Sequence, residues 1–223
     1  MSPSHEFDQD LSVHCVSNCT PTVFVIDGDI SVRESLDLLI RSEGWHAEIL
    51  EPAQECFVRT RQLTPSCLIL DVSLGGLELQ KRIACEMPDL PIILLSGLGD
   101  IRLSVQAMKA GAVDFLVKPF RNDVLLRSIR ESLERSRVVL ERKAALRDLS
   151  DGYASLTPRE RQVMALVVSG LLNKQVGGEL GIAEQTVKAH RGQVMQKMKA
   201  DSLAHLVRMA SRLDPMRQAI QAA

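Results

Sequence analysis

The stretch from residue 156 to 198 constrains the fold most, because it places three short amphipathic helices end to end. Thr157 is a good N-cap, Pro158 suits the first helical position, and Glu160 completes a capping box with Thr157. Gly170 stands where this helix should end. The spacing therefore predicts a helix that begins at Pro158 and stops before Gly170.

Two further helices follow. Asn173 is predicted to cap the second helix, which runs to Gly181, and a third helix begins near Gln185 after a short turn. On the third helix the residues at core spacing are Val187, Val194 and Met198, and those left for a polar face are Thr186, Lys188, His190, Arg191, Gln193 and Lys197. This is the layout of a helix-turn-helix, and a polar, basic helix is what the major groove of DNA accepts.

The second helix contains two adjacent glycines, Gly177 and Gly178. Each glycine costs about 1 kcal/mol relative to alanine in a helix interior. The pair either softens this helix or allows another segment to pack closely against it, and we favour close packing.

Charge is divided unevenly along the chain, although the whole carries a net charge of only −1. Residues 153–213 carry nine Lys or Arg against four Asp or Glu, whereas residues 1–127 carry eleven against eighteen. A basic module joined to an acidic one predicts a DNA-binding domain with a regulatory partner domain. Aromatic residues make up only 3% of the chain, which disfavours stacking on single strands and indicates duplex DNA.

Residues 156–213 resemble the LuxR/GerE-type four-helix DNA-binding domain of response regulators, most closely the FixJ/NarL subfamily. The resemblance is carried by LTPRERQV, the NK that opens the second helix, ELGI, TVKAHR and SLAHLVRMA. It implies that the third helix enters the major groove, with Lys188, Ala189 and Gly192 nearest the base edges and Thr186, His190, Arg191 and Lys174 facing phosphates. Gly192 offers no side chain with which to read a base.

The resemblance also makes a fourth helix, Ser202 to Leu213, the contact of a homodimer on DNA. Its apolar residues are Leu203, Leu206, Val207, Ala210 and Leu213, and part of this stripe must cover the domain core. Only the remainder is free for a partner. A dimer would place two recognition helices about one turn of DNA apart, and RNA polymerase is a further expected partner.

Residues 21–127 alternate short apolar runs with amphipathic stretches. The expected strands are TVFVI, HAEIL, CLIL, PIILLS and VDFLVK, and the intervening segments, including PAQECFVRTRQL, have helical character. Continuous apolar strands that are each followed by a helix specify an α/β doubly wound, five-stranded parallel sheet. Ligands bind such a sheet at the carboxyl ends of its strands.

Polar residues stand at those ends: Asp27 and Asp29, then Asp71, Ser96 and Lys118. Carboxylates suit Mg²⁺, an ammonium neutralises a phosphate oxygen, and Asp71 is the natural nucleophile toward a phosphohistidine. The sequence has no Gly-rich phosphate loop, which argues against a nucleotide-dependent enzyme. We therefore interpret the protein as a regulator and not as an enzyme.

The same positions resemble the receiver domain of a two-component response regulator, with Lys118-Pro119-Phe120 as the most specific motif. The resemblance implies that Asp71 accepts phosphate from a sensor histidine kinase and that Lys118 contacts the phosphoryl group. It makes Ser96 the switch hydroxyl, Phe115 the switch aromatic and Pro119 a cis proline.

The chain departs from the receiver pattern twice. Gly28 replaces an acidic residue that normally touches the metal, and Asp29 is the expected substitute. The segment after Asp71 is about four residues short, although Ser73 still offers a backbone carbonyl to a metal. Two hypotheses stay open: phosphorylation of Asp71 at an impaired Mg²⁺ site, or a pseudo-receiver controlled by a protein or small-molecule partner.

The predicted organisation is a disordered tail (1–20), the receiver (21–127), a helical linker (128–152) ending at Asp151-Gly152, the helix-turn-helix domain (153–213) and a second tail (214–223). The linker is expected to be a solvated helix and less readily a short coiled coil. A signal peptide and a membrane-spanning segment are not expected, so a cytoplasmic protein with no membrane contact is predicted.

The five cysteines indicate no metal or disulfide framework. His14, Cys15 and Cys19 form a cluster without a second half and predict a metal site only weakly. Cys56, Cys67 and Cys85 are expected to act as small apolar core residues.

Overall fold

The computed structural model describes residues 19–50, 64–97 and 99–221, with only the backbone described for residues 76 and 214–221. The chain divides into two compact units, residues 1–143 and 144–223. Each unit is described by itself. The expected N-terminal tail, Cys56 and the helix PAQECFVRTRQL lie mainly or wholly outside the described residues.

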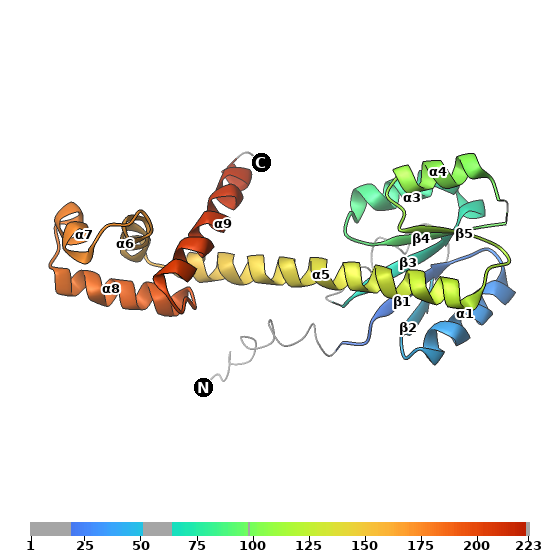
Figure 1. The fold of residues 1–223 in the computed structure, drawn as a ribbon, viewed down its shortest axis with the longest axis horizontal. Coiled ribbons are helices and arrows are strands. Elements are labelled where there is room, and N and C mark those ends of the chain that lie inside the picture. The colour runs from blue at the N-terminus through green and yellow to red at the C-terminus, as the bar shows by residue number, and fades with distance from the viewer. Residues whose placement is uncertain (1–18, 51–63, 98, 222–223) are drawn as a thin grey trace, which may run out of the picture. The chain divides into compact units, whose positions relative to one another are not determined.

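The N-terminal unit is built on a five-stranded parallel sheet (Figure 1). Its strands are β1 (Thr22–Ile26), β2 (His46–Ile49), β3 (Ser66–Asp71), β4 (Ile92–Ser96) and β5 (Asp114–Val117). They are ordered β2-β1-β3-β4-β5, and every neighbouring pair is parallel. The doubly wound sheet predicted from the sequence is therefore confirmed.

Helices cover both faces of this sheet. The described helices of the unit are α1 (Ile30–Ser42), α3 (Gly76–Glu86), α4 (Ile101–Lys109) and the first part of α5 (Asn122–Ala154). Side chains alternate along each strand, so Val23 and Val25 join a core with α1 and α5, whereas Phe24 and Ile26 join one with α3 and α4. All of β1 is buried, and its sequence is apolar from Val23 to Ile26.

Two of the cysteines differ in their placement. Cys67 on β3 is buried in the core as predicted, and burial raises the pKa of its thiol far above the ordinary value. Cys85 on α3 is exposed, so its prediction as a core residue was wrong. It lies on the solvent side of an amphipathic helix, next to the exposed Glu86.

Helix α5 is longer than the sequence indicates. It continues through Asp151 and Gly152 to Ala154, so the prediction that these two residues end it was wrong. A side chain at position 152 would lie 3.2 Å from the backbone oxygen of Lys197. Gly152 therefore permits close packing at the end of α5, and Leu149 is buried in the core of the C-terminal unit.

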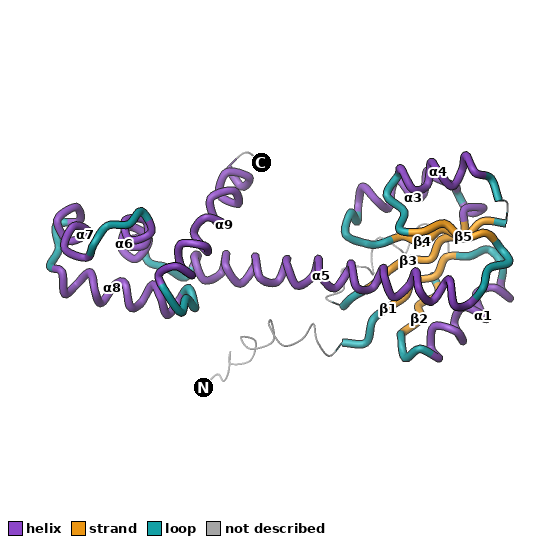
Figure 2. The backbone as a smooth tube through the Cα atoms, viewed as in Figure 1, coloured by secondary structure: helices purple, strands orange, loops and turns teal. Residues whose placement is uncertain are grey.

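The C-terminal unit contains the predicted helix-turn-helix (Figure 2). Its helices after α5 are α6 (Pro158–Val168), α7 (Asn173–Leu180), α8 (Glu184–Lys197) and α9 (Leu203–Gln221). The capping box of Thr157 and Glu160 is present. Helix α9 runs beyond the predicted end at Leu213. No helix within the described ranges is both long and apolar enough to cross a membrane.

The start of α7 corrects one prediction. Leu172, not Asn173, is the N-cap residue, and its backbone N–H donates to Gln175 Oε1 at 2.8 Å. Asn173 is instead the first helical residue, and its Oδ1 accepts a hydrogen bond from Arg191 Nη1 on α8 at 3.1 Å. Its side chain therefore joins two helices and does not cap one.

The two adjacent glycines of α7 have different surroundings. A Cβ on Gly177 would lie 2.7 Å from the backbone oxygen of Ile182, whereas one on Gly178 would meet nothing within 4 Å. Gly177 is buried and Gly178 is exposed. Close packing, the favoured interpretation of the pair, is confirmed at Gly177.

The glycine pair therefore provides a matched test. Gly178→Ala should stabilise the C-terminal unit by about 0.5–1 kcal/mol, since it raises helix propensity at no steric cost. Gly177→Ala should destabilise it by about 1–3 kcal/mol, because a backbone atom must move. Urea unfolding followed by circular dichroism measures both, and Trp45 fluorescence identifies the separate transition of the N-terminal unit. Equal effects of the two substitutions would contradict this account.

Candidate functional site

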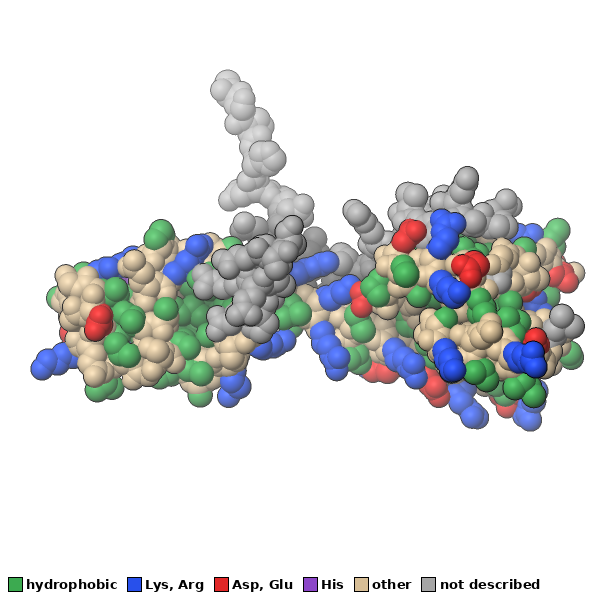
Figure 3. Space-filling view, turned by 90° about the horizontal axis from the view of Figure 1, so that it is seen from above, with side chains coloured by type: hydrophobic (Ala, Val, Ile, Leu, Met, Phe, Trp, Pro, Cys, Tyr) green, Lys and Arg blue, Asp and Glu red, His purple; other side chains and the backbone are tan. Residues whose placement is uncertain are grey.

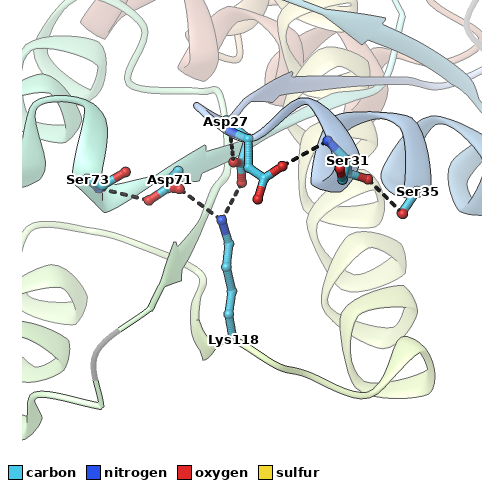
Figure 4. Close-up of polar contacts among 7 residues, drawn as sticks. Asp27, Ser31, Ser35, Asp71, Ser73 and Lys118 are labelled. Atoms are coloured by element: carbon cyan, nitrogen blue, oxygen red, sulfur yellow. Dashed lines mark hydrogen bonds and ion pairs between the residues drawn. The ribbon is translucent and has the colours of Figure 1, made fainter.

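Three charged side chains meet at the carboxyl edge of the sheet (Figure 4). Asp27 follows β1, Asp71 ends β3 and Lys118 follows β5. Lys118 Nζ lies 2.6 Å from Asp27 Oδ2 and 2.8 Å from Asp71 Oδ2. The sequence predicted these residues at the carboxyl ends of strands, and the structure brings them into direct contact.

Each carboxylate is oriented by a backbone N–H two residues further along the chain. Asp27 Oδ1 accepts a hydrogen bond from Asp29 N at 2.9 Å, and Asp71 Oδ1 accepts one from Ser73 N at 2.8 Å. In both residues the other carboxylate oxygen accepts a hydrogen bond from Lys118 Nζ. The turns after β1 and β3 thus fix both acids so that they face one cation.

Burial makes these interactions strong. The side chain of Asp27 is fully buried, that of Asp71 is 9% exposed and that of Lys118 is 20% exposed. Burial alone would raise the pKa of Asp71, but hydrogen bonds from Lys118 and Ser73 outweigh it and lower that pKa below its usual range. Burial would lower the pKa of Lys118, but its bonds to Asp27 and Asp71 raise it instead.

The other predicted residues of the receiver lie near this group. Ser96 is buried at the end of β4, and its backbone oxygen accepts a hydrogen bond from Lys118 N at 2.7 Å. Phe115 on β5 is half-buried and packs against the core shared with α3 and α4. The Lys118–Pro119 peptide bond is cis, as the resemblance implies.

Receiver domains typically bind Mg²⁺ for phosphorylation, and this group of side chains has the right chemistry but few oxygen donors. Asp27 and Asp71 supply carboxylate oxygens of the kind that Mg²⁺ prefers. Asp29, the expected substitute ligand, uses Oδ1 to accept a hydrogen bond from Ser31 N and thereby caps α1. Among the described residues no group of three or more His, Cys, Asp or Glu side chains is arranged to hold a metal ion.

The residues predicted to touch DNA lie on α8 and at the start of α7. Thr186, Lys188, Ala189, Gly192 and Lys174 are exposed, whereas His190 and Arg191 are half-buried. Lys188 Nζ lies 3.2 Å from Glu184 Oε1 one turn earlier in an exposed pair. Such a pair is worth little in water, so it leaves Lys188 able to turn toward a phosphate or base.

Lys197, like Arg191, belongs to the expected polar face but contacts its own domain. Its Nζ lies 2.7 Å from Glu160 Oε2, and the same oxygen accepts a hydrogen bond from Thr157 N at 2.8 Å. Lys197 thus ties the end of α8 to the capping box of α6. Sequence reasoning missed this contact because 37 residues separate the partners.

Surface charge follows the division seen in the sequence. On the face shown in Figure 3, basic and acidic side chains are mixed on the N-terminal unit, whereas acidic ones are sparse on the C-terminal unit. Residues 153–213 carry a net charge of +5 and residues 1–127 one of −7. A surface with few carboxylates repels the phosphates of DNA least.

Family models match both units. Residues 23–130 match the response regulator receiver domain, and residues 154–210 match the bacterial regulatory proteins of the luxR family. The chain belongs to the FixJ/NarL family of response regulators. It therefore combines a receiver with a LuxR-type DNA-binding domain, as in a two-component transcriptional regulator.

Relatives share this arrangement over nearly the whole chain. Nodulation protein W of Bradyrhizobium diazoefficiens is 45% identical over 90% of this chain and 89% of its own length. The transcriptional regulatory protein FixJ of the same organism is 39% identical over 85% of this chain and 94% of its own. A solved structure of response regulator StyR is 41% identical, with a TM-score of 0.77, covering 87% of this chain and all of that one.

The charged group at the sheet edge predicts a pH-dependent stability. Lys118→Met should lower the free energy of unfolding by about 2–3 kcal/mol at pH 7, because two buried carboxylates lose their counter-charge. The pKa of folded Asp71 lies below its unfolded value of about 3.9, so the pairing stabilises the fold above that pH. The stabilisation disappears as the pH falls through the folded value, and the deficit of Lys118→Met should shrink accordingly.

Urea unfolding followed by Trp45 fluorescence measures this deficit, since the single tryptophan packs on the core between the sheet, α1 and α5. Lys81→Met is the matched control. Lys81 pairs with Glu78 at 2.9 Å on an exposed surface, so its loss should cost less than about 1 kcal/mol. A Lys118→Met deficit that is equally large at about pH 3, below the ordinary aspartate pKa, would contradict the assignment.

Proposed function

We propose that the receiver controls DNA binding through phosphorylation of Asp71. The observation that supports this most is the direct contact of Lys118 Nζ with Asp71 Oδ2 and Asp27 Oδ2 at the carboxyl edge of the sheet. A buried carboxylate with a depressed pKa is ionised at neutral pH and is therefore able to act as a nucleophile. The kinase partner that a receiver implies supplies the phosphoryl group.

In the transfer, an oxygen of Asp71 forms a bond to phosphorus while the bond between phosphorus and the histidine nitrogen of the kinase breaks. The Lys118 ammonium would move from a carboxylate oxygen to a phosphoryl oxygen and offset its charge. We assign Mg²⁺ to Asp27, Asp71 and the backbone carbonyl of Ser73, with Asp29 as an accessory ligand. The ion would supply charge neutralisation at the phosphoryl oxygens.

Ser96 and Phe115 are proposed to transmit the change. Ser96 is buried at the end of the strand beside β3, and its backbone already bonds to Lys118. A phosphoryl group on Asp71 would attract the Ser96 hydroxyl, and half-buried Phe115 would shift with β5. Phosphorylation then favours one of two pre-existing states of the domain, as in other population shifts.

Helix α8 is proposed to enter the major groove of duplex DNA. Lys188, Ala189 and Gly192 would lie nearest the base edges, with Thr186, His190, Arg191 and Lys174 at phosphates. The exposed side of α8 and the sparse acidic side chains of this unit support the proposal. Since Gly192 has no side chain, the backbone or the shape of the groove would contribute to recognition there.

A homodimer on DNA is proposed through α9. Leu206 and Leu213 are buried in the domain core, whereas Leu203 and Val207 remain exposed. The stripe is therefore split as expected, and the exposed pair is available to a second copy or to RNA polymerase. An inverted-repeat site would follow from the two-fold symmetry of such a dimer.

A phosphate-independent receiver is the second candidate function. It is favoured by Gly28, which supplies no side-chain ligand, and by Lys118, which already contacts both carboxylates. In that case a protein or small-molecule partner would bias the same receiver states.

Phosphate incorporation separates these two candidates. With labelled acetyl phosphate and Mg²⁺, the native chain should incorporate phosphate and Asp71→Asn should incorporate none. Asp100→Asn is a matched control, because Asp100 is an exposed carboxylate that caps α4. Incorporation that persists in Asp71→Asn would refute the assignment, and no incorporation in any variant would favour the phosphate-independent receiver.

Substitution of two lysines tests the proposed DNA interface, with a duplex selected for binding from a random library. Lys188→Ala should weaken specific binding by about 1–3 kcal/mol and relax sequence preference, as expected for a residue at a base edge. Lys174→Ala should weaken binding to all sequences and lower the salt slope by about one, as expected for a phosphate contact. Fluorescence anisotropy at several salt concentrations measures both effects. Unchanged affinity of Lys188→Ala for the selected duplex would exclude α8 as the reading helix.

A further inference from the structure

Gly28 and Leu74 meet beside the charged group of Asp27, Asp71 and Lys118. Gly28 directly follows Asp27, and Leu74 lies three residues after Asp71, in the 3-10 helix Val72–Leu74. A Cβ placed on Gly28 would lie 3.2 Å from Leu74 Cδ2 and 3.8 Å from its Cγ. Any side chain at position 28 would therefore start out against the Leu74 side chain.

Leu74 is held in this place by packing. It is half-buried and belongs with Val72 and Leu77 to the side chains that pack against the core shared with α3 and α4. Moving it away would expose apolar surface, at a cost of about 25 cal/mol per Å². The space beside Gly28 is thus occupied by an anchored hydrocarbon group and not by an oxygen ligand.

The remaining oxygen ligands are few and carry little net negative charge for a divalent cation. Two carboxylates share one ammonium, which leaves a single net negative charge in the group. The Asp29 carboxylate is engaged at the start of α1. Hard divalent cations require six or more oxygens, and their affinity rises with the number of charged ligands.

We propose, building on the phosphorylation site proposed above, that Leu74, packed against Gly28, makes the group of Asp27, Asp71 and Lys118 a weak binding site for divalent cations. The Lys118 ammonium then serves as its resident counter-charge. Phosphorylation of Asp71 consequently requires a high concentration of Mg²⁺. Restoring a carboxylate at position 28 is effective only when Leu74 is shortened.

The test is titration of the full chain with Mn²⁺ alone, with free ion followed by electron paramagnetic resonance. The native protein should bind with a Kd of about 1 mM, as sites with few charged ligands do. Gly28→Asp with Leu74→Ala should bind about tenfold or more tightly, whereas either single substitution should bring a much smaller gain. Gly28→Asn with Leu74→Ala is the matched control, of similar size but without the charge, and should bind like the native protein.

Three results would overturn the proposal. They are micromolar binding by the native chain, a double variant no tighter than the native chain, and a full gain from Gly28→Asp alone. If the double variant does not fold, Gly28→Ala gives a second test. Gly28→Ala should lower the Tm of the otherwise native chain and leave the Tm of the Leu74→Ala variant unchanged. Equal changes in Tm in both backgrounds would also overturn the proposal.

Metal binding and phosphate incorporation are separate readouts. Tighter Mn²⁺ binding by the double variant without phosphate on Asp71 in any variant would refute the proposed function and leave the Leu74 contact supported. Phosphate on Asp71 together with an unchanged Mn²⁺ Kd in the double variant would support the proposed function and refute the role of the Leu74 contact.

Discussion

Two carboxylates are buried at one edge of the sheet, and the Lys118 ammonium between them makes that burial tolerable. An uncompensated buried charge costs several kcal/mol, so the ends of β1, β3 and β5 have to meet at one cation. Asp27 and Asp71 are each turned toward it by a backbone N–H two residues later. The same contact that stabilises the fold also keeps Asp71 ionised, so the architecture and the proposed chemistry depend on one interaction.

The C-terminal unit depends on close approach of backbones instead. Gly177 lets α7 lie against the turn at Ile182, and Gly152 lets the end of α5 lie against the end of α8. Lys197 and Glu160 add a charged link between α8 and the start of α6. The contacts of Gly152 and Lys197 are made at the end of α8, whereas Lys188 lies nearer its start and is exposed.

Sequence periodicity predicted the strands and most helices because burial on a sheet or in a helical core imposes a repeat that is local in the chain. The charged group could also be predicted, since parallel strand ends meet at one edge. The contacts that were missed join distant residues. Arg191 donates a hydrogen bond to Asn173, and Lys197 forms an ion pair with Glu160. Neither pair produces a local pattern in the sequence. Gly152 was misjudged because a glycine that ends a helix and one that allows close packing look alike in a sequence.

The two departures from the receiver pattern that the resemblance implies, at Gly28 and after Asp71, lie side by side in space. Leu74, in the segment after Asp71, has its Cδ2 atom 3.2 Å from where a Cβ at position 28 would stand. A Cβ there would require Leu74 to shift against the core that it helps to cover, so a glycine at position 28 accommodates Leu74 where it lies. Gly28 and the segment after Asp71 are therefore not two independent signs of a disabled receiver. The charged group of Asp27, Asp71 and Lys118 lies at the carboxyl ends of β1, β3 and β5, and its ion pairs are present beside Gly28.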